Sequence, residues 1–133
     1  MNFKEKIILH VDDDPDDRDL LREVMQKVAP NVKLTFAING LQALETLNLA
    51  KETQSLPCLI VLDLNMPYLN GAQTFERIKA DTSLSKIPIV VLSSGENPSD
   101  KSMFSQAGVD YFAKPIEFSA LKAIGSHLAN LCC

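Results

Sequence analysis

The sequence predicts an α/β fold: a doubly wound (βα)5 domain in which helices cover both faces of a five-stranded parallel sheet. Two observations predict it. Short apolar runs alternate five times along the chain with longer segments whose apolar residues recur at helical spacing. Hydrophobic residues also make up 46% of the 133 residues, which suffices for one continuous core. We therefore expect a single domain over residues 1–133.

The expected strands are short apolar runs that end on polar or turn residues. The clearest are residues 7–11 (IILHV), 58–62 (CLIVL) and 87–92 (IPIVVL). Runs of this length, alternating with helical segments, are typical of strands in βαβ units. We predict strands over residues 6–11, 32–37, 58–62, 87–92 and 110–113.

The first two expected helices cover residues 16–28 and 40–52. Pro15 and two aspartates precede the first, where proline geometry and negative charge suit a helix N-terminus. The turn residues Asn39-Gly40 precede the second. The apolar face of the first helix consists of Leu20, Leu21, Val24, Met25 and Val28, and that of the second of Leu41, Leu44, Leu47 and Leu49.

Three more helices, over 71–80, 98–107 and 117–130, complete the repeat. The third follows the turn Asn70-Gly71. The fourth has the weakest helical pattern, whereas the fifth has the clearest apolar face. The residues that support these three faces are Phe75 and Ile78; Met103, Phe104 and Ala107; and Phe118, Leu121, Ile124, Leu128 and Leu131.

Composition and charge exclude several classes of protein. The formal net charge is -4, and no stripe of lysine and arginine is present, which argues against a nucleic-acid partner. No apolar run approaches the ~20 residues that a membrane span needs, and the N-terminus lacks a secretory pattern. We therefore expect a cytoplasmic protein with no membrane contact.

The three cysteines show neither metal-ligand spacing nor a disulfide framework. We interpret Cys58 as a small buried strand residue. Cys132 and Cys133 are interpreted as an inert chain end.

Polar residues stand at the carboxyl ends of four expected strands. Asp12–Asp14 follow the first, Asp63 the third, Ser93 the fourth and Lys114 the fifth. Ligands of open parallel sheets bind outside these ends. Adjacent carboxylates repel one another, so the acidic run indicates a divalent cation. A metal ion, a carboxylate, a hydroxyl and an ammonium group at one edge of a sheet together predict a site for a phosphoryl group.

Taken in order, these residues resemble the signature of the response-regulator receiver domains of two-component signalling. The resemblance rests on Asp12-Asp13, the segment 63–67 (DLNMP) with Gly71 after it, Ser93, and Lys114-Pro115. It covers essentially the whole chain. The resemblance implies a flavodoxin-like fold with strand order 2-1-3-4-5.

The resemblance also implies a role for each acid. Asp63 is similar to the phosphoacceptor, an exposed carboxylate that attacks phosphorus. Asp12 and Asp13 resemble the pair that holds Mg²⁺, with Asp13 the direct ligand and Asp12 acting through water. Asp63 and the backbone carbonyl of Asn65 complete that ligand set.

The resemblance also implies roles for a lysine and for two residues that change conformation on phosphorylation. Lys114 resembles the lysine that pairs with the acids and then with the phosphoryl group, and its bond to Pro115 is typically cis in the family. Ser93 resembles the switch hydroxyl and Tyr111 its aromatic partner. A strand-end serine and a half-buried strand tyrosine remain the plain alternatives for that pair.

Other polar residues near these strand ends have plainer interpretations. We interpret Asp14, Asp16, Asp17 and Asp19 as the solvated first turn of a helix. His10 stands in the first strand, where many receivers carry an aliphatic residue. We expect its ring to be hydrogen-bonded on the packed side of the sheet and do not interpret it as a ligand.

The implied function is a phosphorylation-dependent switch with no enzymatic turnover beyond its own phosphorylation and dephosphorylation. A sensor histidine kinase or a histidine phosphotransfer protein supplies the phosphoryl group, and the fourth helix and fifth strand signal to a downstream protein. We expect a stand-alone receiver, monomeric or weakly dimeric. Residues 14–18 (DPDDR) resemble stand-alone receivers paired with phytochrome-type or other hybrid kinases.

Three alternative functions fit these residues less well. A phosphatase of the haloacid-dehalogenase kind needs a second acid two residues after the nucleophile, but position 65 is asparagine. A flavodoxin-like FMN carrier needs a phosphate cradle after the first strand, and the acidic loop here would repel phosphate. A phosphorylation-independent scaffold usually lacks a site residue, and none is missing in this sequence.

Overall fold

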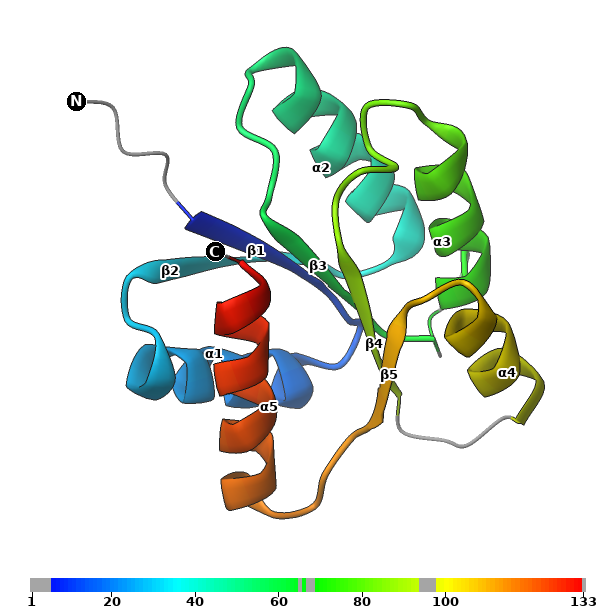
Figure 1. The fold of residues 1–133 in the computed structure, drawn as a ribbon. Coiled ribbons are helices and arrows are strands. Elements are labelled where there is room, and N and C mark those ends of the chain that lie inside the picture. The colour runs from blue at the N-terminus through cyan, green and yellow to red at the C-terminus, as the bar shows by residue number, and fades with distance from the viewer. Residues whose placement is uncertain (1–5, 65, 67–68, 94–97, 133) are drawn as a thin grey trace.

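A computed structural model of the chain describes residues 6–64, 66, 69–93 and 98–132. Five parallel strands form one sheet in the order β2-β1-β3-β4-β5, and helices lie on both of its faces (Figure 1). The predicted fold class and strand order are therefore confirmed. The elements are β1 (Lys6–Val11), α1 (Pro15–Val28), β2 (Val32–Ala37), α2 (Gly40–Glu52), β3 (Leu59–Leu62), α3 (Gly71–Ala80), β4 (Ile89–Ser93), α4 (Pro98–Gln106), β5 (Asp110–Ala113) and α5 (Phe118–Leu131).

The sheet separates two hydrophobic clusters. One lies between the sheet and α1 with α5, and the other between the sheet and α2, α3 and α4. Side chains alternate between the faces of a strand, so Ile8 of β1 packs toward α1 and α5, while Leu9 and Val11 pack toward the other helices. By the same alternation, His10 and Asp12 lie on the face of Ile8.

Capping residues begin three of the helices: α2 and α3 begin where the predicted turn residues placed them, and α1 begins at Pro15, one residue earlier than predicted. Asp14 caps α1 by accepting a hydrogen bond from the backbone N–H of Asp16. Asn39 caps α2, and Asn70 forms a reciprocal capping box with Gln73 of α3. Within the described part of the chain, no helix has the length and apolar character that a membrane crossing requires.

The predicted apolar face of α2 is wrong in part. Leu41 and Leu49 are 46% and 62% exposed, whereas Ala43 and Leu47 are fully buried. A 3.6-residue period turns Leu41 and Leu49 away from the stripe that faces the sheet. Leu44 remains half-buried and packs against the core.

The cysteines also differ from expectation. The sulfur atoms of Cys58 and Cys132 are in direct contact and their Cα atoms lie 5.0 Å apart, a separation that a disulfide spans. The end of α5 lies beside the start of β3, a proximity that a sequence separation of 74 residues conceals. Cys133 lies outside the described residues.

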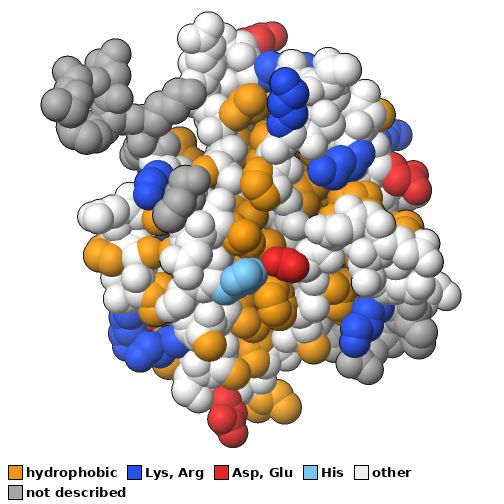
Figure 2. Space-filling model, viewed as in Figure 1, with side chains coloured by type: hydrophobic (Ala, Val, Ile, Leu, Met, Phe, Trp, Pro, Cys, Tyr) orange, Lys and Arg blue, Asp and Glu red, His pale blue; other side chains and the backbone are white. Residues whose placement is uncertain are grey.

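β5 is an edge strand of the sheet and lies beside β4. Figure 2 shows hydrophobic side chains in a strip between α5 and the strands β4 and β5. The ring of Phe112 in β5 meets the ring of His127 in α5 edge-on, and His127 Nε2 lies 2.9 Å from Asp110 Oδ2. This polar pair bridges β5 and α5 at the surface.

Gly71, the first residue of α3, packs directly on the chain that leaves β3. A Cβ at this position would lie 2.5 Å from the carbonyl oxygen of Asp63 and 2.6 Å from the Cα of Leu64. The Gly71 N–H also donates to the Leu64 carbonyl. Only glycine lets the two segments approach this closely.

We expect Gly71→Ala to lower the free energy of unfolding by about 1–3 kcal/mol, because backbone must shift to admit the methyl group. Gly108→Ala is the comparison variant: Gly108 has a φ of 75° but open space around it, so a methyl group there strains only the local backbone. Urea unfolding of both variants measures the two losses. A Gly71→Ala chain that is as stable as the unmodified chain would contradict the close packing described here.

Candidate functional site

Backbone hydrogen bonds bring the ends of β1 and β3 together. The Asp12 N–H donates to the Ala37 carbonyl at 3.0 Å, and the Asp63 N–H donates to the Val11 carbonyl at 3.0 Å. The parallel ladder therefore continues one residue beyond each strand. This continuation fixes both carboxylates at the carboxyl edge of the sheet.

The β4–β5 pairing places the cation at the same edge. The Lys114 N–H donates to the Ser93 carbonyl at 2.7 Å, directly after Ser93 pairs with Ala113. The expected cis bond before Pro115 is wrong here: the described residues contain no cis peptide. The trans isomer is the intrinsically favoured one, and the long lysine side chain reaches the acids from it.

Three carboxylates converge at this edge. One oxygen each of Asp12, Asp13 and Asp63 lies within 4.8 Å of the other two. Asp12 is 0% and Asp63 3% exposed, while Asp13 is exposed to solvent. The expectation of an exposed Asp63 carboxylate is therefore wrong, because Lys114 and the neighbouring acids lie over it. An all-oxygen set with one open side fits a hard divalent cation that keeps several waters. Asn65, the expected carbonyl ligand, lies outside the described residues.

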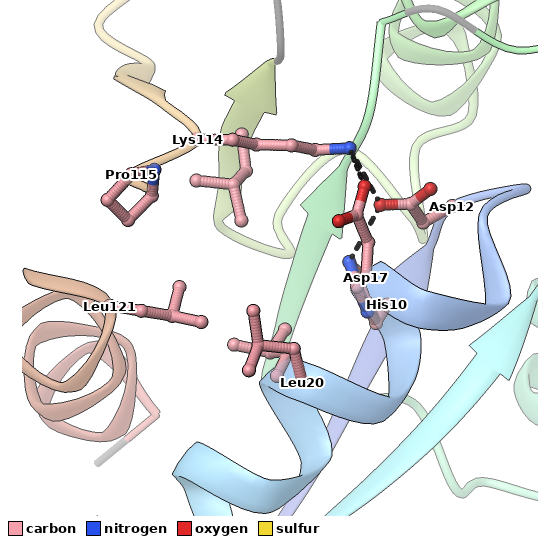
Figure 3. Close-up of a pocket in the computed structure, with 9 residues that line it drawn as sticks. His10, Asp12, Asp17, Leu20, Lys114, Pro115 and Leu121 are labelled. Carbon is pink, nitrogen blue, oxygen red and sulfur yellow. Dashed lines mark hydrogen bonds and ion pairs between the residues drawn. The ribbon is translucent and has the colours of Figure 1, made fainter. Parts of the chain in front are cut away.

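The Lys114 ammonium points toward the carboxylates of Asp12 and Asp17 (Figure 3). Its Nζ is 2.7 Å from Asp17, 3.0 Å from Asp12 and 3.5 Å from Asp63. Burial alone would lower the pKa of Lys114. The hydrogen bond to Asp17 and the charges of Asp12 and Asp63 outweigh burial and raise that pKa above its ordinary value.

Sequence reasoning missed Asp17 and Arg18. Asp17 was expected to be solvated, yet it is only 34% exposed and makes the shortest contact to Lys114. Arg18 Nη1 donates to the backbone carbonyl of Asp12 at 2.9 Å. The first turn of α1 points both side chains back over the end of β1. The positions of both residues in the first turn of the helix could have predicted these contacts. An acidic first turn is, however, usually explained by the helix dipole alone.

His10 borders the site from within the sheet. Its ring is 1% exposed, and Nε2 lies 3.5 Å from Asp12 Oδ2. Burial would raise the pKa of Asp12. The His10 ring, the Asp14 N–H and Lys114 together outweigh that effect and lower the pKa to about 2. As expected, His10 is on a packed face, but its Nδ1 has no hydrogen-bond partner among the described residues.

Ser93 and Tyr111 lie on the other face of the sheet from His10 and Asp12. Ser93 is 2% exposed at the end of β4. Tyr111 is half-buried, and its ring centroid lies 6.3 Å from that of Phe104 in α4. Phe104 in turn packs edge-on against Phe75 of α3 at 5.0 Å. The two expected switch residues are thus on the side of α3 and α4.

The sequence matches the family model of the response regulator receiver domain over residues 8–125. The chain belongs to this family. Among its relatives is the two-component response regulator ARR17 of Arabidopsis thaliana, which is 33% identical over 92% of this chain and 84% of ARR17. The response regulator Rcp1 of Synechocystis is 35% identical over 71% of this chain and 66% of Rcp1.

Solved receiver structures share the fold closely. The phosphorylated cyanobacterial phytochrome response regulator RcpA superposes with a TM-score of 0.84 and 29% identity, over 95% of this chain and 92% of RcpA. The Mn²⁺-bound form of Rcp1 superposes with a TM-score of 0.81 and 30% identity, over 94% and 92% of the two chains. Receiver domains as a family hold Mg²⁺ or Mn²⁺ in an acidic pocket, and the three clustered aspartates form such a pocket here.

The low pKa of Asp12 predicts an acid-sensitive stability. A folded-state pKa of about 2, below the ordinary 3.8, adds stability that is complete above about pH 5 and is lost as the pH falls toward 2. Asp12→Asn cannot titrate, so between about pH 5 and pH 3 the unmodified chain should lose about 1 kcal/mol more unfolding free energy than this variant. Urea unfolding at both pH values measures the difference. Parallel losses would show that Asp12 is not held as described.

Proposed function

We propose that the protein is a phosphorylation-dependent switch in which Asp63 accepts a phosphoryl group in a Mg²⁺-dependent reaction. A sensor histidine kinase or a histidine phosphotransfer protein is the proposed donor. The observation that carries the proposal is the position of Asp63. Its carboxylate shares a cluster with Asp12 and Asp13 and lies 3.5 Å from the Lys114 ammonium. Nucleophile, metal ligands and cation therefore meet at one point.

The chemistry follows from this arrangement. An Asp63 oxygen attacks phosphorus and a P–O bond forms. The P–N bond to the donor imidazole breaks, and its electron pair returns to the ring nitrogen, which takes up a proton from water. Mg²⁺ held by Asp12, Asp13, Asp63 and the Asn65 carbonyl would neutralise charge on the phosphoryl oxygens. Lys114 supplies the second positive charge.

Phosphorylation changes the partners available to Lys114. Esterification removes the charge of one Asp63 oxygen and adds a dianionic group beside the ammonium. Lys114 then gains more from the phosphoryl oxygens than from Asp17, whose half-exposed carboxylate water can solvate. We propose that Lys114 leaves Asp17 and turns to the phosphoryl group.

The proposed output surface is formed by α4 and β5. Ser93 moves to donate a hydrogen bond to the phosphoryl group, and Tyr111 follows inward. The contact of the Tyr111 ring with Phe104 supports transmission to α4. A downstream protein would respond to the shifted population of this surface. We propose no nucleic-acid partner and a monomer or weak homodimer.

The two competing functions lack support from particular residues. A hydrolytic aspartate-nucleophile enzyme would need an acid at position 65, which is asparagine. A phosphorylation-independent scaffold has no need of the buried Asp63 carboxylate beside Lys114. We therefore propose an acceptor that undergoes its own phosphorylation and dephosphorylation and turns over no external substrate.

Asp63→Asn should abolish labelling by an acyl phosphate in the presence of Mg²⁺, because an amide oxygen is too weak a nucleophile to attack phosphorus. Intact-mass spectrometry measures the addition of one phosphoryl group. Asp19→Asn is the matched control, since Asp19 is an exposed acid whose carboxylate pairs with Arg22. Chelation of Mg²⁺ should also prevent labelling of the unmodified chain. Labelling that persists in Asp63→Asn would place the acceptor elsewhere.

A further inference from the structure

We propose that His10 is a positioning residue that holds the Asp12 carboxylate in the site, independently of Lys114. The inference rests on the proposed function, because it concerns what happens when Lys114 moves to a phosphoryl group. Receivers with an aliphatic residue at this position would lack this second support. Three features of His10 support this role: its placement, its rigidity, and an Nδ1 that has no partner among the described residues.

The placement follows from strand geometry. His10 and Asp12 are two residues apart at the end of β1, so their side chains stand side by side on one face. Asp12 Oδ1 accepts the Asp14 N–H at 2.9 Å. Asp12 Oδ2 faces both Lys114 Nζ at 3.0 Å and His10 Nε2 at 3.5 Å. Lys114 and His10 therefore share one carboxylate oxygen.

The two donors differ in freedom of movement. Lys114 reaches Asp12 through four flexible methylene groups. His10 pairs with Phe36 of β2 and Val61 of β3, so its backbone lies inside the sheet. Its ring lies against Phe36 at a centroid distance of 6.4 Å and is 1% exposed. When Lys114 departs, His10 stays in place and can keep the Asp12 carboxylate from following.

The other ring nitrogen indicates that packing alone does not explain His10. An ionised Asp12 accepts hydrogen bonds only, so the Nε2 that faces it carries a hydrogen. The buried Nδ1 has no partner among the described residues. The ring borders a cavity of about 30 Å³ that it shares with Asp12, Asp17 and Leu21. Leucine would fill this position without placing a polar nitrogen there, so the contact with Asp12 is what the imidazole adds.

The test measures Mg²⁺ affinity of the unphosphorylated full chain by calorimetry. His10→Leu should weaken Mg²⁺ binding about tenfold, the lower end of what loss of an outer partner of a metal ligand costs. His10→Gln places an N–H donor at similar reach and should restore most of that affinity. Ile8→Val, on the same face of β1, is the control for packing and should leave the affinity unchanged.

A spectroscopic measurement on the unmodified chain keeps the test independent of variant folding. Long-range ¹H–¹⁵N NMR should show His10 as the Nε2–H tautomer. An Nδ1–H tautomer would overturn the proposal, as would His10→Leu binding Mg²⁺ like the unmodified chain or His10→Gln binding as weakly as His10→Leu. These results concern His10 alone. Failure of the proposed function is recognised separately, by labelling that survives Asp63→Asn.

Discussion

One buried ion-pair cluster organises the site: the Lys114 ammonium surrounded by the carboxylates of Asp12, Asp17 and Asp63. Two of these acids are almost fully buried, and two buried like charges would repel strongly without a cation between them. Lys114 neutralises part of that charge and leaves Asp13 on the open side. The cluster therefore supplies an electrostatic reason for a divalent cation and for a dianionic phosphoryl group to enter the same place.

Because side chains alternate along a strand, the proposed metal site and the proposed switch residues lie on opposite faces of the sheet. His10 and Asp12 lie on the side of α1 and α5, whereas Tyr111 packs toward α3 and α4. The proposed chemistry and the proposed switch are thus on opposite faces and meet only at the strand ends. The hydrogen bond from the Lys114 N–H to the Ser93 carbonyl is a direct link between them. A displacement of Lys114 would reach Ser93 through the backbone as well as through the phosphoryl group.

Much of this arrangement could be predicted because it depends on local patterns. The apolar runs marked β1, β2 and β5 at their observed bounds, and strand ends alone predicted that Asp63 and Lys114 would meet. Three features escaped prediction for physical reasons. Asp17 has the sequence features of an ordinary helix-start acid, Leu49 lies on the side of α2 away from its buried stripe, and the partner of Cys58 is distant in sequence. The proximity of His10 to Asp12 could have been predicted, since residues two apart in a strand share a face.

The most direct test of the account follows the Lys114 ammonium through phosphorylation. ¹⁵N NMR of its side chain, assigned with Lys114→Arg, is recorded before and after an acyl phosphate has modified the chain, with modification verified by intact mass. The account predicts that the Nζ signal of the unmodified state depends on Asp17 and shifts in Asp17→Asn. It also predicts that after phosphorylation the signal moves and no longer responds to that substitution. A Lys114 signal that stays the same, and stays sensitive to Asp17, in the phosphorylated chain would contradict it.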